Sequence, residues 1–180
     1  MPTLEFGPDF GRLTVLTTAD GAAARLGHSL TLLVTEWTAT LTYDGDEPQS
    51  VAVVAHLDTL SVADGAGMKP LSEGDYQTIL RNAASTLHSA EYPTCRFDAY
   101  AFTQTADGYL VAGTLEIAHR PQPCSISVTV GSCPTGLELK GSAWVRQKDF
   151  GLVPYSTMLG ALRVADRVQI GVALELPLSA

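Results

Sequence analysis

The side chains able to carry chemistry are spread along the chain, and their spacing matches no known metal motif. The four histidines, His28, His56, His88 and His119, fall in different segments, without i, i+4 pairing and without cysteine partners at zinc-site spacing. Zinc motifs place their ligands at short, fixed intervals, because all of them must reach one ion. The sequence therefore predicts no metal site and no cofactor.

Two short motifs have the letters of catalytic motifs but lack the partners. Asp149-Phe150-Gly151 has the order of the magnesium-binding motif of protein kinases, yet the chain has no glycine-rich phosphate loop and no matching strand lysine. The Gly-x-Ser-x-Gly elbow of serine hydrolases is absent as well. We predict that Asp149 and Gly151 form a turn where a strand ends, that Phe150 packs inward, and that the protein is not an enzyme.

Three carboxylates, Asp64, Glu73 and Asp75, lie close together in sequence, where paired acids could perform acid-base chemistry. The alternative is structural, because Ser72 stands three residues before Asp75 in the spacing of a capping box. Acidic residues in the first turn of a helix are also favoured by the helix dipole. We therefore expect these carboxylates to cap a helix and face water.

Composition limits the partners and the compartment. The 19 acidic and 11 basic residues give a net charge of −8, which repels phosphate backbones and argues against a nucleic-acid partner. No apolar run approaches the roughly 20 residues of a membrane span, so we expect no integral membrane segment. The first residues, MPTLEFGPDFGRL, lack the basic and apolar regions of a secretion signal, which indicates a cytoplasmic location. Cys95, Cys124 and Cys133 form no CxxC pair; reduced thiols are expected, with a Cys124 to Cys133 pairing across a hairpin as the alternative.

Turn signals divide the chain into short apolar segments typical of an all-β protein, within a single domain over residues 1–180. Two helices are predicted between them. One covers Ala19 to Gly27, and the other, at about 73–86, is amphipathic and followed by Pro93. The predicted strands cover residues 10–17, 29–43, 50–57, 94–105, 109–118, 124–131, 136–147 and 167–176.

Apolar and polar residues alternate along these strands, so each has one dry face and one wet face, as in an antiparallel sheet with a single buried surface. Closing eight such strands into a ring removes exposed edges, which favours an up-and-down barrel over a sandwich. Small inward residues such as Ala55, Gly113, Gly141 and Ala143 either leave room for one ligand or relieve crowding at bends. The long connection after the third strand carries the second helix, which we expect to cover one end as a lid.

From Gly11 to Pro177 the chain resembles the YceI-like family. GHSLTLLV at 27–34 is similar to the family's His-Ser before its second strand, and LSV at 60–62 to the end of its third. YPTCRF, GTLEI with Pro123 six residues beyond it, and KDFGL resemble three further motifs in the same order and spacing. The chain departs from the pattern at His119, where relatives usually have Gly, at Gln147, where they have Arg, and in the run NAASTLHSA before the Tyr-Pro.

The resemblance implies a lipocalin-like barrel, of bacterial origin, that holds a polyisoprenoid or another long-chain lipid without catalysis. A second hypothesis is a structural or dimerising barrel filled by its own side chains, with Trp37, Phe102 and Trp144 as exposed aromatic contacts. Strand parity and the lid helix predict the ligand-lining residues. They are Leu33, Val53, Ala55, Tyr76, Ile79, Leu80, Phe97, Val111, Leu115, Ile126, Val128, Leu139, Ala143, Ile170 and Val172.

Overall fold

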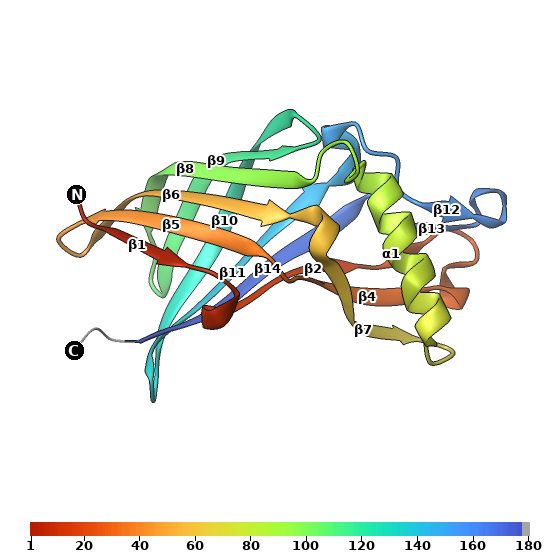
Figure 1. Ribbon diagram of the computed structural model, residues 1–180, viewed down its shortest axis with the longest axis horizontal. Helices are drawn as coiled ribbons and strands as arrows, with labels where there is room; N and C mark the ends of the chain where they lie inside the picture. The colour runs from red at the N-terminus through yellow and green to blue at the C-terminus, as the bar shows by residue number, and fades with distance from the viewer. Residues whose placement is uncertain (178–180) are drawn as a thin grey trace.

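A long antiparallel sheet curls into a half-barrel, and one helix lies across its open end (Figure 1). The computed structural model describes residues 1–177. Its strands are β1 (Thr3–Phe6), β2 (Gly11–Thr17), β3 (Ala19–Asp20), β4 (His28–Val34), β5 (Trp37–Asp44), β6 (Glu47–His56), β7 (Leu60–Gly67), β8 (Thr94–Gln104), β9 (Gly108–Ile117), β10 (Arg120–Cys133), β11 (Gly136–Arg146), β12 (Ser156–Thr157), β13 (Leu162–Val164) and β14 (Arg167–Pro177). The helix is α1 (Glu73–Leu87), and 3₁₀ turns cover Pro8–Phe10, Ala24–Leu26, Leu57–Thr59, Gln147–Phe150 and Met158–Gly160.

Eleven strands form the main sheet, in the order β1-β5-β6-β8-β9-β10-β11-β14-β2-β4-β7, and β12, β13 and β3 form a smaller one. All-β architecture and antiparallel pairing are as predicted. The number of strands is not: each of the eight predicted segments contains a strand, but β1, β3, β7, β12 and β13 were not predicted. Four of these five have two to four residues and leave little alternation to detect, whereas β7, with eight residues, lies in the predicted connection before α1.

A corner in the sheet accounts for most of the remaining difference from a ring of eight. Thr35 and Glu36 separate β4 from β5, and the turn Leu57–Thr59 separates β6 from β7. At this corner the Thr35 amide donates to the Thr59 carbonyl (3.3 Å) and the His56 amide to the Glu36 carbonyl (3.0 Å). Among residues 1–177, β1 and β7 end the sheet without pairing to each other. A curled half-barrel therefore replaces the predicted eight-stranded closed ladder.

The predicted helix from Ala19 to Gly27 is wrong. Ala19 and Asp20 instead pair with Val164 and Arg163 of β13, and only Ala24–Leu26 forms a 3₁₀ turn. Gly21 has φ 98°, which a right-handed helix does not allow. Strand pairing and the Asp20–Arg163 ion pair override the helix propensity of the alanines.

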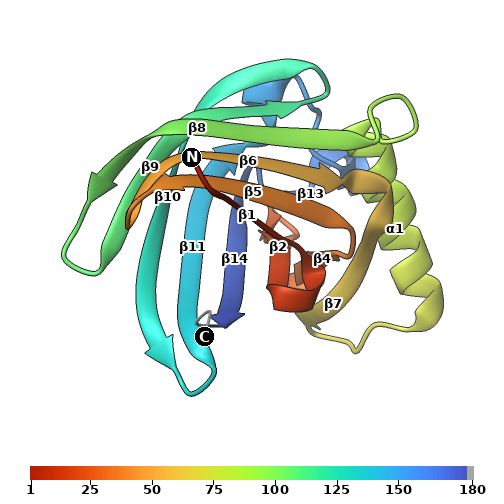
Figure 2. The same ribbon diagram turned by 60° about the vertical axis from the view of Figure 1, so that its left-hand side comes forward.

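The helix α1 forms where the sequence predicts it. The Asp75 amide donates to Ser72 Oγ (3.3 Å) and the Ser72 amide donates to Asp75 Oδ2 (2.8 Å), which completes the capping box. His88 ends the helix in the left-handed conformation at φ 52°, five residues before Pro93. Figure 2 shows α1 beside the open edge of the curled sheet, next to β7.

A β-bulge in β8 corrects the predicted orientation of its second half. Ala99 pairs with Gly113 and Ala101 with Ala112, so Tyr100 is an extra residue on this strand. One extra residue moves every later side chain to the other face. Ala101 is therefore exposed instead of inward, and Phe102 packs against the core instead of facing water.

Candidate functional site

A cavity of about 500 Å³ lies between the half-barrel and α1, and its walls are mostly apolar. The strands supply Leu, Val and Ile side chains in alternate positions, because one face of each strand looks inward. The helix and the turns beyond β11 supply the opposite wall. Lining residues include Leu13, Val15, Leu30, Leu32, Val34, Ala55, Leu60, Leu115, Ile117, Val145, Val168 and Ile170 from strands, and Thr78, Ile79, Asn82, Ala83, Thr86 and Leu87 from α1.

Four of the predicted lining residues lie on this cavity. They are Ala55, Ile79, Leu115 and Ile170. Eight more face the same interior but pack against one another further along the barrel, away from the cavity: Val53, Phe97, Val111, Ile126, Val128, Leu139, Ala143 and Val172. Strand parity places eleven of these inside and helical spacing places Ile79 there, and the structure divides the twelve between a hollow half and a filled half.

Three predicted lining residues lie elsewhere. Leu33 is on the opposite face of β4 from Leu32 and Val34, which line the cavity. The three apolar residues in a row leave the parity of this segment ambiguous, and a bulge between Thr31 and Leu32 shifts its register with β7. Tyr76 and Leu80 are half-buried but do not reach the cavity.

The cavity-facing stripe of α1 is more polar than predicted. Besides Ile79 and Ala83 it contains Thr78, Asn82 and Thr86, which follow the helical spacing of one face. The Thr78 hydroxyl donates to the Gly74 carbonyl (3.0 Å). Asn82 and Thr86 were missed because apolarity was the only signal used to select the inward face, and NAASTLHSA offers little of it.

Gln147, which the sequence marks only as a departure from its relatives, also lines the cavity, and its side chain is nearly buried. Its Nε2 donates to the Ala165 carbonyl (2.9 Å) and its amide to the Asp166 carbonyl (2.9 Å). The first of these bonds fixes which end of the side-chain amide is the nitrogen. Within residues 1–177 the side-chain oxygen accepts no hydrogen bond from another residue.

Cys95 lines the cavity, and burial raises the pKa of its thiol to about 11. The thiol is therefore neutral at physiological pH and behaves as a small apolar group. Burial also raises the pKa of Cys124, and all three cysteines are free.

Charged groups sit at the open end of the cavity and are already paired. Arg163 and Asp20 form an ion pair of 3.0 Å, and the pKa of Asp20 is lowered by the Gly21 amide and then by this arginine. The pKa of Asp75 is lowered by the Ser72 backbone amide. His28 Nε2 lies 2.8 Å from the Lys69 carbonyl oxygen.

The remaining chemical motifs take structural roles. Phe150 is buried and lines the cavity, and Gly151 is left-handed at φ 70°, which confirms the predicted turn. His119 lies in the turn between β9 and β10 at φ 56°. In the part of the chain that the structure describes, no three His, Cys, Asp or Glu residues converge in a way that would hold a metal ion.

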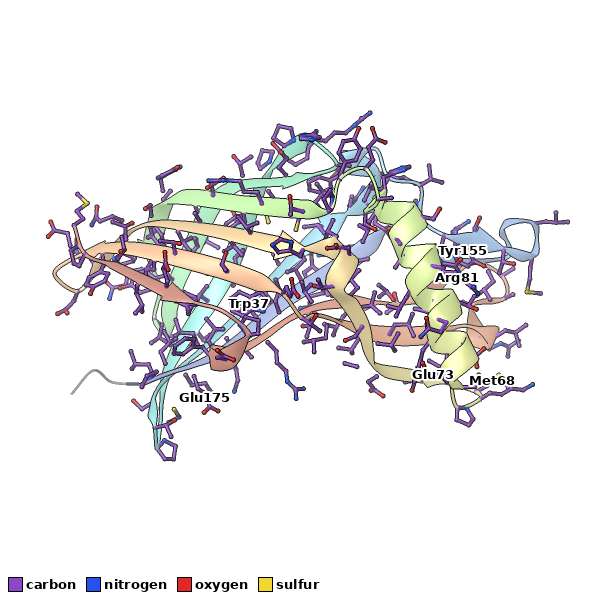
Figure 3. The ribbon with its side chains drawn as sticks, in the orientation of Figure 1. Trp37, Met68, Glu73, Arg81, Tyr155 and Glu175 are labelled. Atoms are coloured by element: carbon purple, nitrogen blue, oxygen red, sulfur yellow. The ribbon has the colours of Figure 1, made fainter. Side chains whose placement is uncertain are left out.

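The predicted exposed aromatics separate into three cases. Trp37 is buried, and within residues 1–177 its Nε1 has no hydrogen-bond partner (Figure 3). Phe102 faces inward because of the bulge. Trp144 is 53% exposed, and the Arg167 guanidinium stacks 4.5 Å above its ring. Only Trp144 therefore remains as an outward aromatic contact.

No helix within residues 1–177 has the length and apolar character needed to cross a bilayer.

Comparison with known proteins gives matches in family and fold. The model of the YceI-like domain matches residues 16–176. A crystal structure of Burkholderia cenocepacia BcnA has a TM-score of 0.69 at 15% identity, covering 91% of this chain and 94% of that one. A crystal structure of a Campylobacter jejuni YCEI protein has a TM-score of 0.59 at 13% identity, covering 83% and 85%. No curated protein matches the chain in sequence.

Proposed function

The chain belongs to the YceI-like domain family, and from that premise we propose that it binds a long-chain apolar ligand, a polyisoprenoid or another lipid, in the cavity beneath α1. The family binds hydrophobic ligands within its barrel. The proposed role is sequestration without catalysis. The observation that carries the proposal is the cavity of about 500 Å³ with apolar walls, a size within the range of small-molecule sites.

Affinity in such a site comes from removing methylene groups from water, at about 0.8 kcal/mol each. Leu, Val and Ile side chains on the strands and Ile79 and Ala83 on α1 supply matching apolar walls. The ligand's length is set by the filled half, where Phe97 and its neighbours leave no continuation of the cavity.

The polar groups on the cavity favour a ligand whose end is uncharged. Gln147 and Asn82 are neutral, the Asp75 carboxylate is negatively charged, and Arg163 is engaged by Asp20 at the open end. A buried carboxylate would lose its hydration without gaining a cationic partner, which is costly. An alcohol can instead donate to the free oxygen of Gln147. A polyprenol is therefore expected to bind more tightly than a fatty acid of similar length.

A pair of variants on one helix tests the cavity. Ala83→Phe places a ring in the cavity, whereas Ala84→Phe adds the same ring to the exposed face of α1. We expect Ala83→Phe to abolish the polyprenol binding that the wild type shows in a fluorescence-quenching titration, and Ala84→Phe to retain it. Equal binding by both variants, or organic extracts of the purified protein that hold no lipid together with no titratable binding, would refute the proposal.

A second candidate function, a dimerising barrel, has one supporting observation, the exposed Trp144 with Arg167 stacked on it. Aromatic and arginine side chains are the common anchors of protein interfaces. Light scattering after size exclusion tests it: a dimer that becomes a monomer in Trp144→Ala would support this function. The cytoplasmic location indicated by the sequence stays a prediction, which fractionation of the source cells tests.

A further inference from the structure

The tip of the hairpin between β12 and β13 exposes two large apolar side chains to water. Both residues also adopt an unfavourable backbone conformation. Met158 and Leu159 have φ of 52° and 56°, and Gly160 follows at φ 88°. Left-handed backbone is unfavourable for residues with a side chain, and turns normally use Gly, Asn or Asp there. Leu159 is fully exposed and Met158 is 53% exposed. Neither folding nor solubility explains this choice of residues.

The hairpin tip belongs to a rim of exposed apolar side chains around the mouth of the cavity. Leu26 and Tyr155 line the cavity and are also exposed, and Met68 is exposed in the loop before α1. Figure 3 shows Met68 and Tyr155 at the same end of the molecule, near α1, with Met68 by the end at which the helix begins. We call residues 19–28, 66–75 and 153–163 the mouth rim.

The mouth rim is electrically neutral in a strongly acidic protein. It contains three acidic residues, Asp20, Glu73 and Asp75, and three basic residues, Arg25, Lys69 and Arg163. The net charge of −8 therefore lies entirely on the remainder of the chain. The rim thus carries no net negative charge for anionic lipid headgroups to repel.

We propose that the mouth rim is a docking surface for a lipid bilayer, on which Met158 and Leu159 enter the headgroup region. Interfacial binding grows with the apolar area that enters the membrane, and projecting loop tips insert where a flat surface does not. A second copy of the chain is a poorer fit, because narrow tips on both sides of an open mouth offer little of the flat area that a stable dimer buries. Docking in this way places the cavity mouth at the membrane, where a long-chain ligand enters without crossing water.

The test uses a double variant that should fold at least as well as the wild type. Met158→Asn with Leu159→Asn removes the apolar side chains and retains a residue type that tolerates left-handed backbone. The matched control is Leu137→Asn, which removes an exposed leucine at the β10–β11 hairpin. Flotation with vesicles of phosphatidylcholine avoids repulsion between the protein and anionic lipid.

We expect the wild type and Leu137→Asn to float with vesicles, and the double variant to lose at least about tenfold in partition. Ala83→Phe should float like the wild type, because docking does not need an occupied cavity, so failure of ligand binding and failure of docking are separable. Absence of flotation by the wild type, or equal flotation by the double variant, overturns the proposal. A concentration-dependent dimer that the double variant loses, without flotation, assigns the rim to a second copy and overturns it as well.

Discussion

The interior has two halves made from the same strands, one filled and one hollow. Neighbouring inward side chains on one strand belong to different halves: Phe97 and Cys95 on β8, and Val172 and Ile170 on β14. The first residue of each pair is packed in the core and the second borders the cavity. Part of the boundary lies close to the corner that separates β4 from β5, since Cys95 borders the cavity and pairs with Ala55, which in turn pairs with Trp37 at the start of β5.

What stands opposite each wall explains the difference. In the filled half, strands face strands, and the buried clusters combine large side chains such as Phe97 and Trp37 with small ones such as Ala99 and Ala39. In the hollow half, part of the wall is α1, whose inward residues Thr78, Ala83 and Thr86 are short. The same apolar face of the sheet therefore encloses a packed core where other strands cover it and a cavity where α1 covers it.

The largest expected effect is the loss of packing in the filled half. Phe97→Ala should lower the free energy of unfolding by about 3–5 kcal/mol, because Phe97 is 6% exposed and its loss leaves a void. Ile79→Ala, on the cavity, should cost less than half of that, since Ile79 has few atoms opposite it. Urea unfolding of both variants measures the difference. Equal losses would mean that the two halves are packed alike.

The next effect concerns Cys95 at the boundary between the halves. Its folded-state pKa of about 11 lies above the ordinary value of 9.0 because burial disfavours the thiolate. Stability from the neutral thiol is complete below pH 9 and is lost as the pH rises toward 11, by about 3 kcal/mol. Unfolding curves at pH 8 to 11 should show this slope in the wild type and a smaller one in Cys95→Ser. A bound ligand should also protect Cys95 from alkylation.

A smaller effect is expected where α1 begins over the hollow half. Ser72→Ala should cost about 1 kcal/mol, because it removes the N-cap hydrogen bond to the Asp75 amide. The lowered pKa of Asp75 means that its contribution is present above the unfolded pKa and is lost as the pH falls through the folded value. Hydrogen exchange should rise in α1 and stay unchanged in the filled half. Ser85→Ala, on the exposed face of the same helix, is the control.

The sequence predicts which residues face the interior and where α1 begins, but it does not predict which part of the interior is hollow. Alternation predicts that Phe97, Leu115 and Ile170 face inward, and the Ser72–Asp75 spacing predicts the start of α1. These signals are local, since they depend on neighbours two to four residues away. Contacts between segments that are distant in the sequence decide which inward residues border a cavity. No local sequence pattern predicts these contacts.

The errors have equally specific causes. The bulge at Tyr100 inverts the face of Phe102 although the letters around it continue to alternate. The alanines of residues 19–27 favour a helix, but pairing with β13 across the mouth decides their conformation. Thr86 and Asn82 border the cavity because α1 packs with that face toward the strands, which the composition of the helix does not specify.

The smallest expected effect tests the parity of β4, where three apolar residues in a row made the two faces indistinguishable. Leu33→Thr should change the free energy of unfolding by only about 0.5 kcal/mol, since Leu33 is half-buried on the outer face and Thr suits a strand. Leu32→Thr should cost several times as much and weaken polyprenol binding, because Leu32 is 6% exposed and borders the cavity. Urea unfolding and the quenching titration measure both. The reverse order would place Leu33 on the cavity and move the wall of the hollow half to the other face of β4.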